Sequence, residues 1–309
     1  MSELDASDAA VSDSGESGAA PITAGLATHG GAPIDPMIPA VVASDLTLRY
    51  RSPSQVTRSI AVDGADFTIP MGSILAVVGE TGSGKSTLAR AVALHTDARD
   101  ERAPVITGGR MQVLGQEIRG ISSRSRAKLG LRVGYLRQEA GQHLAPRLTV
   151  EENIIEPILA VDRKFDRTEA GVAAAGLLDS VRLPLRLLTA MPHELSKGQR
   201  QRVAIARSLV LEPDLLVADD PTAGIDVTVR GQILDVIADI QQERSFAALI
   251  VTADLGEVRR IASRVAVMMR GRIVGFGDLD EVLDDPFHPY VRRLAESLEA
   301  TSALPVESS

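Results

Sequence analysis

Residues 79–86 have the types and the spacing of a loop that binds phosphate. Their sequence, GETGSGKS, fits the pattern G-x-x-x-x-G-K-[ST]. Glycines let the backbone N–H groups turn inward around a phosphate, and the start of the following helix adds the positive end of its dipole. The lysine would neutralise the β- and γ-phosphates of a nucleotide, and the serine hydroxyl would coordinate Mg²⁺. The predicted nucleotide contacts of this loop are Gly79, Gly82, Ser83, Gly84, Lys85, Ser86 and Thr87.

An acid at the end of another apolar segment would complete this site. Residues 215–218 (LLVA) lead directly into Asp219. Ligands of α/β sheets bind at the carboxyl ends of the strands, so the Asp219 carboxylate would lie close to a metal held by Ser86. We therefore predict a nucleotide and Mg²⁺ as the ligands, with Asp219 contacting the metal as an outer partner or through water.

A parallel sheet is needed to position these residues. The spacing of Ile233, Val236, Ile237 and Ile240 predicts a helix that packs one face on the core. Continuous apolar runs, typical of strands buried on both faces, occupy residues 74–78 (ILAVV), 215–218 (LLVA) and 247–251 (AALIV). Strand, helix and strand in this order predict an α/β fold with a mostly parallel sheet.

Two further segments fill out this fold. Residues 141–193 have a helical composition without a comparable strand, and we interpret them as an inserted helical subdomain, at about 140–200. Residues 265–269 and 273–276 flank Arg-Gly-Arg, which predicts a hairpin.

Composition excludes several classes of protein. The 309 residues include no cysteine, which rules out disulfides, thiolate zinc sites and iron–sulfur ligation. No apolar run approaches the ~20 residues of a membrane-spanning helix. Residues 1–48 hold seven carboxylates and no Lys or Arg, so the rest of the chain is nearly neutral, which argues against binding to nucleic acid. We predict a disordered acidic tail at 1–38, an ATP-binding domain at 39–290 and a short extension at 291–309.

With these motifs in order, residues 42–290 resemble the ATP-binding subunits of ABC transporters. The segment 195–202 (LSKGQRQR) is similar to the signature motif of that family. Gln138 resembles the glutamine of its Q-loop, and Asp226 occupies the position of its D-loop aspartate. Tyr50 sits where an aromatic side chain commonly stacks on adenine, although a strand aromatic packed in the small β-region is the alternative.

The resemblance implies the ABC ATPase fold, with a P-loop core, a small antiparallel β-region and the helical subdomain. It also implies that two such domains meet head to tail, with each ATP held between the phosphate loop of one and the signature motif of the other. Ser196, Gly198 and Gln199 would then contact ATP held by the partner chain. Gln138 would contact Mg²⁺ and couple the movement to membrane subunits. We expect Arg200 and Arg202 to form a solvated helix face.

Three positions depart from the family pattern. Asp220 stands where the family usually has the glutamate that polarises the attacking water, and a misplacement of about 1 Å costs on the order of 10²-fold in rate. Ala253 stands at the position of the switch histidine, and a lost transition-state donor costs about 10²–10³-fold. Lys197 replaces the first glycine of the signature. We therefore predict a site that binds ATP and hydrolyses it slowly, with Asp220 as a weak base.

The segment 286–290 (PFHPY) favours the dipeptide, oligopeptide and nickel importers within the family. We predict a peptide importer subunit at the cytoplasmic face of the cell membrane. Its partners would be a second, non-identical ABC ATPase subunit, two membrane permease subunits and an extracytoplasmic substrate-binding protein. The alternatives are a nickel importer subunit, a soluble subunit of a phosphonate-degrading complex, and a nucleotide-sensing scaffold without useful turnover.

Overall fold

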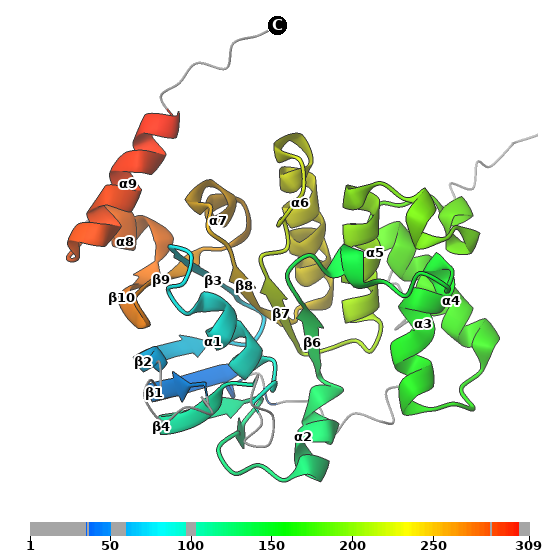
Figure 1. The fold of residues 1–309 in the computed structure, drawn as a ribbon, viewed down its shortest axis with the longest axis horizontal. Helices are drawn as coiled ribbons and strands as arrows, with labels where there is room; N and C mark the ends of the chain where they lie inside the picture. The colour runs from blue at the N-terminus through cyan, green and yellow to red at the C-terminus, as the bar shows by residue number, and fades with distance from the viewer. Residues whose placement is uncertain (1–34, 36, 51–59, 97–102, 285, 303–309) are drawn as a thin grey trace, which may run out of the picture.

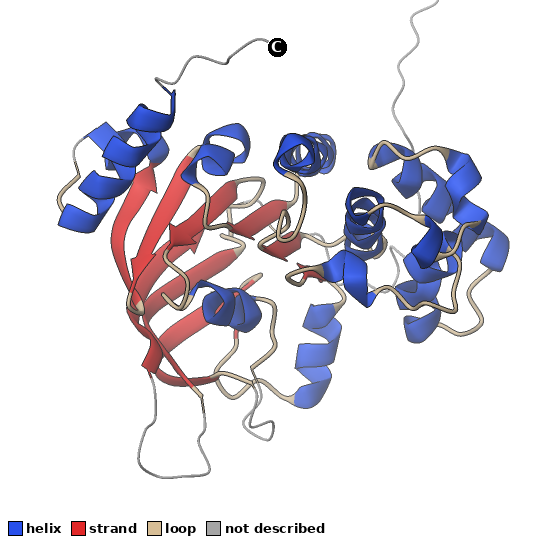
Figure 2. Cartoon of the chain, turned by 45° about the horizontal axis from the view of Figure 1, so that its top comes forward, coloured by secondary structure: helices blue, strands red, loops and turns tan. Residues whose placement is uncertain are grey.

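Two sheets and a separate group of helices make up the described chain (Figures 1 and 2). The computed structural model describes residues 35, 37–50, 60–96, 103–284 and 286–302. Most of the acidic tail predicted at 1–38 lies outside these described residues.

The larger sheet has six strands in the order β10-β9-β3-β8-β7-β6. Within it β3 pairs in parallel with β8 and β9, β7 pairs in parallel with β6 and β8, and β10 runs antiparallel to β9. The strands are β3 (Ile74–Gly79), β6 (Val133–Leu136), β7 (Leu215–Asp219), β8 (Ala247–Val251), β9 (Arg264–Met269) and β10 (Arg272–Asp278). The three apolar runs are therefore neighbouring parallel strands, and the predicted hairpin is the β9–β10 pair.

The smaller sheet is antiparallel, with the strand order β2-β1-β4-β5. Its strands are β1 (Val41–Arg49), β2 (Ile60–Ile69), β4 (Val105–Val113) and β5 (Gln116–Glu117). This confirms the predicted small antiparallel β-region.

Alternation along β3 divides the core into two layers, because successive side chains of a strand point to opposite faces. Leu75 and Val77 pack with α1 (Lys85–Val92) and the smaller sheet. Ala76 and Val78 pack with the helices on the other face of the sheet. The phosphate loop, between β3 and α1, is thus held between two buried elements.

The helical subdomain lies at the β6 edge of the larger sheet (Figure 1). Side-chain caps start each of its main helices: Thr149 caps α3, Asp166 caps α4 and Ser196 caps α5. Its elements are the short 3₁₀ turns η1 (Ala140–His143), η2 (Leu185–Thr189) and η3 (Pro192–Glu194), and the helices α3 (Val150–Val161), α4 (Arg167–Ser180) and α5 (Lys197–Leu209). No strand interrupts residues 141–193, as predicted.

The remaining helices surround the sheets. They are α2 (Ser123–Gly130), α6 (Val227–Arg244), α7 (Leu255–Ile261), α8 (Leu279–Asp284) and α9 (Pro289–Ser302). The expected domain end at residue 290 falls inside α9, and Val291 is buried in the same core as Tyr290. Among the described residues, none of the helices combines the length and the apolar character that spanning a membrane requires.

Candidate nucleotide site

A cavity of about 530 Å³ lies at the carboxyl ends of β3, β7 and β8. It brings together the predicted residues Gly82, Gly84, Lys85, Ser86, Thr87, Gln138, Asp219, Asp220 and Ala253. They come from separate parts of the chain, and the parallel order of the strands brings them to one edge.

Two glycines of the phosphate loop are required by its close packing. Gly79 has φ +147°, and a Cβ there would lie 2.0 Å from the Met268 carbonyl oxygen. Gly84 has φ +105°, and its Cβ would lie 2.2 Å from the Ala61 carbonyl oxygen. A larger residue at either position would push the loop away from β2 and β9.

Lys85 is held against the backbone of its own loop. Its Nζ donates to the carbonyl oxygens of Gly79, at 2.6 Å, and of Glu80, at 2.8 Å. Burial lowers the pKa of Lys85, although the carboxylates of Asp220, Asp219 and Glu80 oppose this shift. The ammonium is therefore fixed at the loop, where a phosphate would give it a stronger partner.

Ser86 and Asp219, the two residues predicted to hold Mg²⁺, are hydrogen-bonded to each other in the cavity. The Ser86 hydroxyl donates to Asp219 Oδ1 at 2.9 Å, and the Asp219 side chain is buried. Burial raises the pKa of Asp219, whereas the Ser86 hydrogen bond, Arg90 and Lys85 lower it. A hydroxyl beside a carboxylate fits Mg²⁺, which takes oxygen ligands and uses one or two carboxylates together with substrate phosphates.

The loop also contains a polar atom that a ligand or water can satisfy. Ser83 is 3% exposed, and its hydroxyl has no hydrogen-bond partner among the described residues. A Cβ built at Gly82 would meet no atom within 4 Å. The loop therefore has both free hydrogen-bonding capacity and open space, which fits a bound phosphate.

Asp220 follows β7 in an unusual backbone conformation, with φ +52°. Its N–H donates to the Val251 carbonyl oxygen at 2.9 Å, which fixes the residue beside the end of β8. Burial raises the pKa of Asp220, and the nearby Glu257 and Asp219 carboxylates raise it further. A raised pKa suits a base that must accept a proton, because catalytic bases work best with a pKa near the working pH.

Glu257 is a buried acid that the sequence analysis missed. Its carboxylate accepts from the Thr222 hydroxyl at 2.8 Å and from the Thr252 hydroxyl at 2.6 Å. The three side chains join α7 to the loops that follow β7 and β8, and these loops carry Asp220 and Ala253. The threonines pair with an acid that is distant in the sequence from one of them, so no local pattern indicates the contact.

Gln138 and Ala253 both line the cavity, in the region of Asp219 and Asp220. The Ala253 side chain is a methyl group, so position 253 offers no side-chain donor to a phosphate. Among the described residues, no group of three or more His, Cys, Asp or Glu side chains is arranged to hold a metal.

Tyr50 does not line the cavity that holds Lys85. Its hydroxyl lies 3.2 Å from Thr87 Oγ1, on the first turn of α1, so the ring adjoins the cavity wall. Stacking of Tyr50 on adenine stays a prediction.

The signature segment lies at the start of α5, apart from this cavity. Ser196 is exposed, its hydroxyl accepts from the Gln199 N–H at 3.2 Å, and the Gln199 side chain accepts from the Ser196 N–H at 2.8 Å. A Cβ built at Gly198 would lie 3.3 Å from Val229, on the first turn of α6. Asp226 caps α6, and the Thr228 N–H and hydroxyl hold the pKa of Asp226 below its usual value.

The expectation of a solvated face at Arg200 and Arg202 is wrong. Arg200 is partly buried and donates to the carbonyl oxygens of Pro192, at 3.3 Å, and Leu195, at 2.6 Å. Arg202 donates to the Gln232 side chain at 2.7 Å. The two arginines therefore connect the signature helix to the turn before it and to Gln232 of α6, because a guanidinium has several N–H donors at the end of a long side chain.

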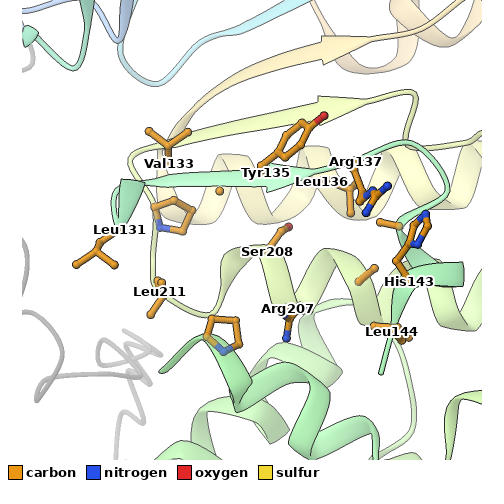
Figure 3. A pocket seen from close by; sticks show the side chains of 15 residues that line it. Leu131, Val133, Tyr135, Leu136, Arg137, His143, Leu144, Arg207, Ser208 and Leu211 are labelled. Carbon is orange, nitrogen blue, oxygen red and sulfur yellow. The ribbon is translucent and has the colours of Figure 1, made fainter. Parts of the chain in front are cut away.

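A second cavity, of about 360 Å³, lies between β6 and α5 (Figure 3). Apolar side chains such as Val133 and Leu211 line it together with Arg137, His143 and Arg207. Arg137 directly precedes Gln138, so this cavity and the nucleotide cavity meet at the same loop. The sequence pattern gave no indication of this cavity.

Known proteins are similar to this chain over most of its length. The sequence pattern of the family described as "ABC transporter" matches residues 62–223. The Di/tripeptide transport ATP-binding protein DppF of Pseudomonas aeruginosa is 35% identical over 272 residues, which are 85% of this chain and 79% of the relative. The Oligopeptide transport ATP-binding protein OppF of Escherichia coli is 35% identical over 77% of this chain and 69% of its own.

A solved structure shares the fold. The ATP-binding cassette MJ0796, solved as a dimer in a post-hydrolysis state bound to ADP and Pi, has a TM-score of 0.67 and 25% sequence identity. The match covers 77% of this chain and 98% of that chain. The α/β arrangement predicted from the apolar runs is confirmed by this likeness.

Proposed function

Because the chain belongs to the ABC transporter family of ATP-binding proteins, we propose that it is the ATP-binding subunit of an importer that moves peptides. The observation that carries this proposal is that two relatives named for peptide transport align with most of this chain. The assembled phosphate loop supports the ATP-binding part of the proposal, since Lys85, Ser86 and Asp219 meet in one cavity.

This chain's residues would bind and orient ATP in a defined division of labour. The Lys85 ammonium would exchange the carbonyl oxygens of Gly79 and Glu80 for phosphate oxygens. Ser86 and Asp219 would hold Mg²⁺, which neutralises phosphate charge when it is bound. Gln138, which lines the same cavity, would complete the metal contacts.

A second ATP-binding subunit would complete the site from outside. Ser196 is exposed, and neither it nor Gly198 or Gln199 lines the cavity that holds Lys85. These three residues would face ATP on a partner chain, because a serine and free N–H groups at a helix start bind anions. Asp226, which caps the neighbouring helix α6, would meet the partner chain beside them. The similarity to a dimer that holds ADP and Pi supports this pairing.

We further propose that the partner is a different chain and that this chain's own site turns over slowly. Asp220 is one methylene shorter than glutamate, and Ala253 provides no donor to the developing charge. A partner with an intact glutamate and histidine would hydrolyse its ATP against Ser196 of this chain. Pairing of two copies of this chain would place both defects in both sites.

The second cavity is the best candidate for contact with a permease. It lies beside the loop of Gln138, so a segment bound there would be linked directly to the nucleotide site. Its apolar walls and the exposed Arg137 fit an amphipathic segment that carries an acidic residue, whereas Arg207 is already paired with Glu156. Two permease subunits, with an extracytoplasmic binding protein beyond them, would hold the chain at the cytoplasmic face of the membrane.

Co-purification from native membranes, followed by peptide uptake into proteoliposomes, tests this proposal. We expect permease subunits to remain with the chain in detergent and uptake to require ATP. Leu211→Asp, in the second cavity, should abolish co-purification and leave ATP affinity unchanged. Leu185→Asp, at an exposed position of η2, serves as the matched control and should retain the permease.

Two other results would assign the chain a different function. ATP-dependent uptake of nickel in place of peptides would assign the chain to the nickel importers. Recovery of the chain only in soluble extracts, without any permease, would contradict the transport role and favour a soluble subunit of a phosphonate-degrading complex.

A further inference from the structure

The turn between β9 and β10 presents an arginine where the backbone favours other residues. Arg270 has φ +47° and Gly271 has φ +85°. A two-residue hairpin turn with both φ values positive strongly prefers Asn-Gly or Asp-Gly, because a side chain with a full Cβ is strained there. An arginine at the first of these positions therefore carries a conformational cost that glycine or asparagine would avoid.

This turn is fastened to the phosphate loop. The Gly271 N–H donates to the Ser83 carbonyl oxygen at 2.9 Å, and the Asp63 N–H donates to the Gly271 carbonyl oxygen at 2.8 Å. Arg272 adds an ion pair, since its guanidinium lies 2.6 Å from Asp63 Oδ2. The backbone of the turn thus keeps a fixed position relative to the loop that binds phosphate.

Arg270 itself lines the nucleotide cavity and is exposed. It has no hydrogen bond or ion pair to any of the described residues, whereas its neighbour Arg272 is paired with Asp63. The strained turn thus holds an unpaired cation at the edge of the cavity. No contact within the described part of the chain explains its presence there.

The charges of the cavity favour a second cation. Lys85 and Asp219 are buried there, and the half-buried Asp220 carboxylate lines the same cavity, so these three residues give it no surplus of positive charge. ATP brings several further negative charges to the same space. A guanidinium suits this ligand, because its planar fork of N–H groups matches phosphate oxygens.

We propose that Arg270 binds a phosphate group of the nucleotide held by this chain, as a second cation beside Lys85. The inference requires that the chain binds ATP but not that it serves an importer, so peptide uptake and ATP affinity test the two proposals separately.

The test is isothermal titration of the full chain with ATP and with AMP, in wild type and in Arg270→Asn. Asparagine is well tolerated at positive φ, so the variant should unfold at the same temperature as wild type or higher. Loss of one charged contact should weaken ATP binding about 10-fold, and AMP binding by a smaller factor. Arg270→Lys should recover most of the ATP affinity, because it keeps the charge.

Arg163→Ala is the matched control, since this arginine is exposed in the loop between α3 and α4. It should bind ATP like wild type. An Arg270→Asn variant with unchanged ATP affinity would overturn the proposal. So would an equal loss for ATP and AMP, because that result would place the contact on the α-phosphate or the nucleoside and not beside Lys85 at the β- and γ-phosphates.

Discussion

The two sides of the nucleotide cavity differ in the polar side chains that they provide. On the side of the phosphate loop, Lys85, Ser86 and Asp219 are all present and in contact with one another or with the loop backbone. On the side formed by the loops after β7 and β8, Asp220 is shortened and Ala253 offers no donor. We therefore propose that binding and cleavage depend on different elements, so that one can be lost while the other is kept.

The largest effect should come from repairing the second side. Asp220→Glu combined with Ala253→His should raise Mg²⁺-dependent turnover at least ~100-fold, because it restores the reach of the base and a donor to the transition state. Phosphate release by the purified chain, alone and beside its partner subunit, measures this. Asp220→Asn with Ala253→Val changes the same positions without restoring either group, and its turnover should not rise.

Turnover of the unmodified chain alone can contradict the proposal of a slow site. A rate at or above ~1 s⁻¹, which is ordinary for an enzyme, would contradict the slow-site proposal. The two sides of the cavity would then be functionally equivalent despite their different residues.

Removal of the cation from the intact side should have the next largest effect. Lys85→Ala should weaken ATP binding about 100-fold, since a charge-assisted contact with phosphate is lost inside a buried site. Fluorescence titration with a labelled ATP analogue measures the change. Lys164→Ala, at an exposed position between α3 and α4, is the matched lysine control and should bind as wild type does.

The contribution of Ser86 to metal binding can be measured separately from the contribution of Lys85 to phosphate binding. Ser86→Ala should reduce the enhancement of ATP affinity by Mg²⁺ about 10-fold and leave affinity in EDTA nearly unchanged, because the hydroxyl acts through the metal. Ser180→Ala removes a hydroxyl that donates to the Gly176 carbonyl oxygen within α4, away from the cavity, and should leave both values unchanged. Equal losses with and without Mg²⁺ would exclude the proposed metal contact.

The smallest effect concerns the signature helix, which does not line this cavity and which we propose contributes to the partner's site. Ser196→Ala removes a helix cap and should lower the free energy of unfolding by about 1 kcal/mol, without changing this chain's ATP affinity. Thr149→Ala removes the equivalent cap of α3 and should cost a similar amount. Chemical unfolding measures both losses.

Hydrolysis by the pair of subunits distinguishes these two caps. Only Ser196→Ala should also slow ATP hydrolysis by the heterodimer, because only this serine would contact the partner's nucleotide. Equal rates of hydrolysis by the two variants would show that Ser196 acts only as a helix cap and does not contact the partner's nucleotide.

The parts of the fold and site that depend on local patterns were predictable. The residues of the phosphate loop are contiguous in the sequence, so the spacing of its glycines, lysine and serine is sufficient to identify it. The contact between Ser86 and Asp219 spans the sheet, yet it was predictable because parallel strands bring their carboxyl ends to one edge. The buried strands were recognisable because both of their faces are apolar.

Contacts between distant elements were not predictable in this way. The pairing of Glu257 with Thr222 requires the particular packing of α7 against the loop after β7. Arg200 was expected in solvent, but the turn before α5 folds back and presents its carbonyl oxygens to the guanidinium. Neither contact follows from periodicity, because periodicity identifies the buried face of an element but not its neighbour.

The sequence by itself determined which chemical groups are present, including the intact phosphate loop and the missing donor at Ala253. Only the tertiary structure decided that Arg270 lines the nucleotide cavity and that a second cavity adjoins the loop of Gln138. The physical reason is that spacing along a strand or helix fixes local geometry, whereas the approach of separate elements is set by the packing of the whole core.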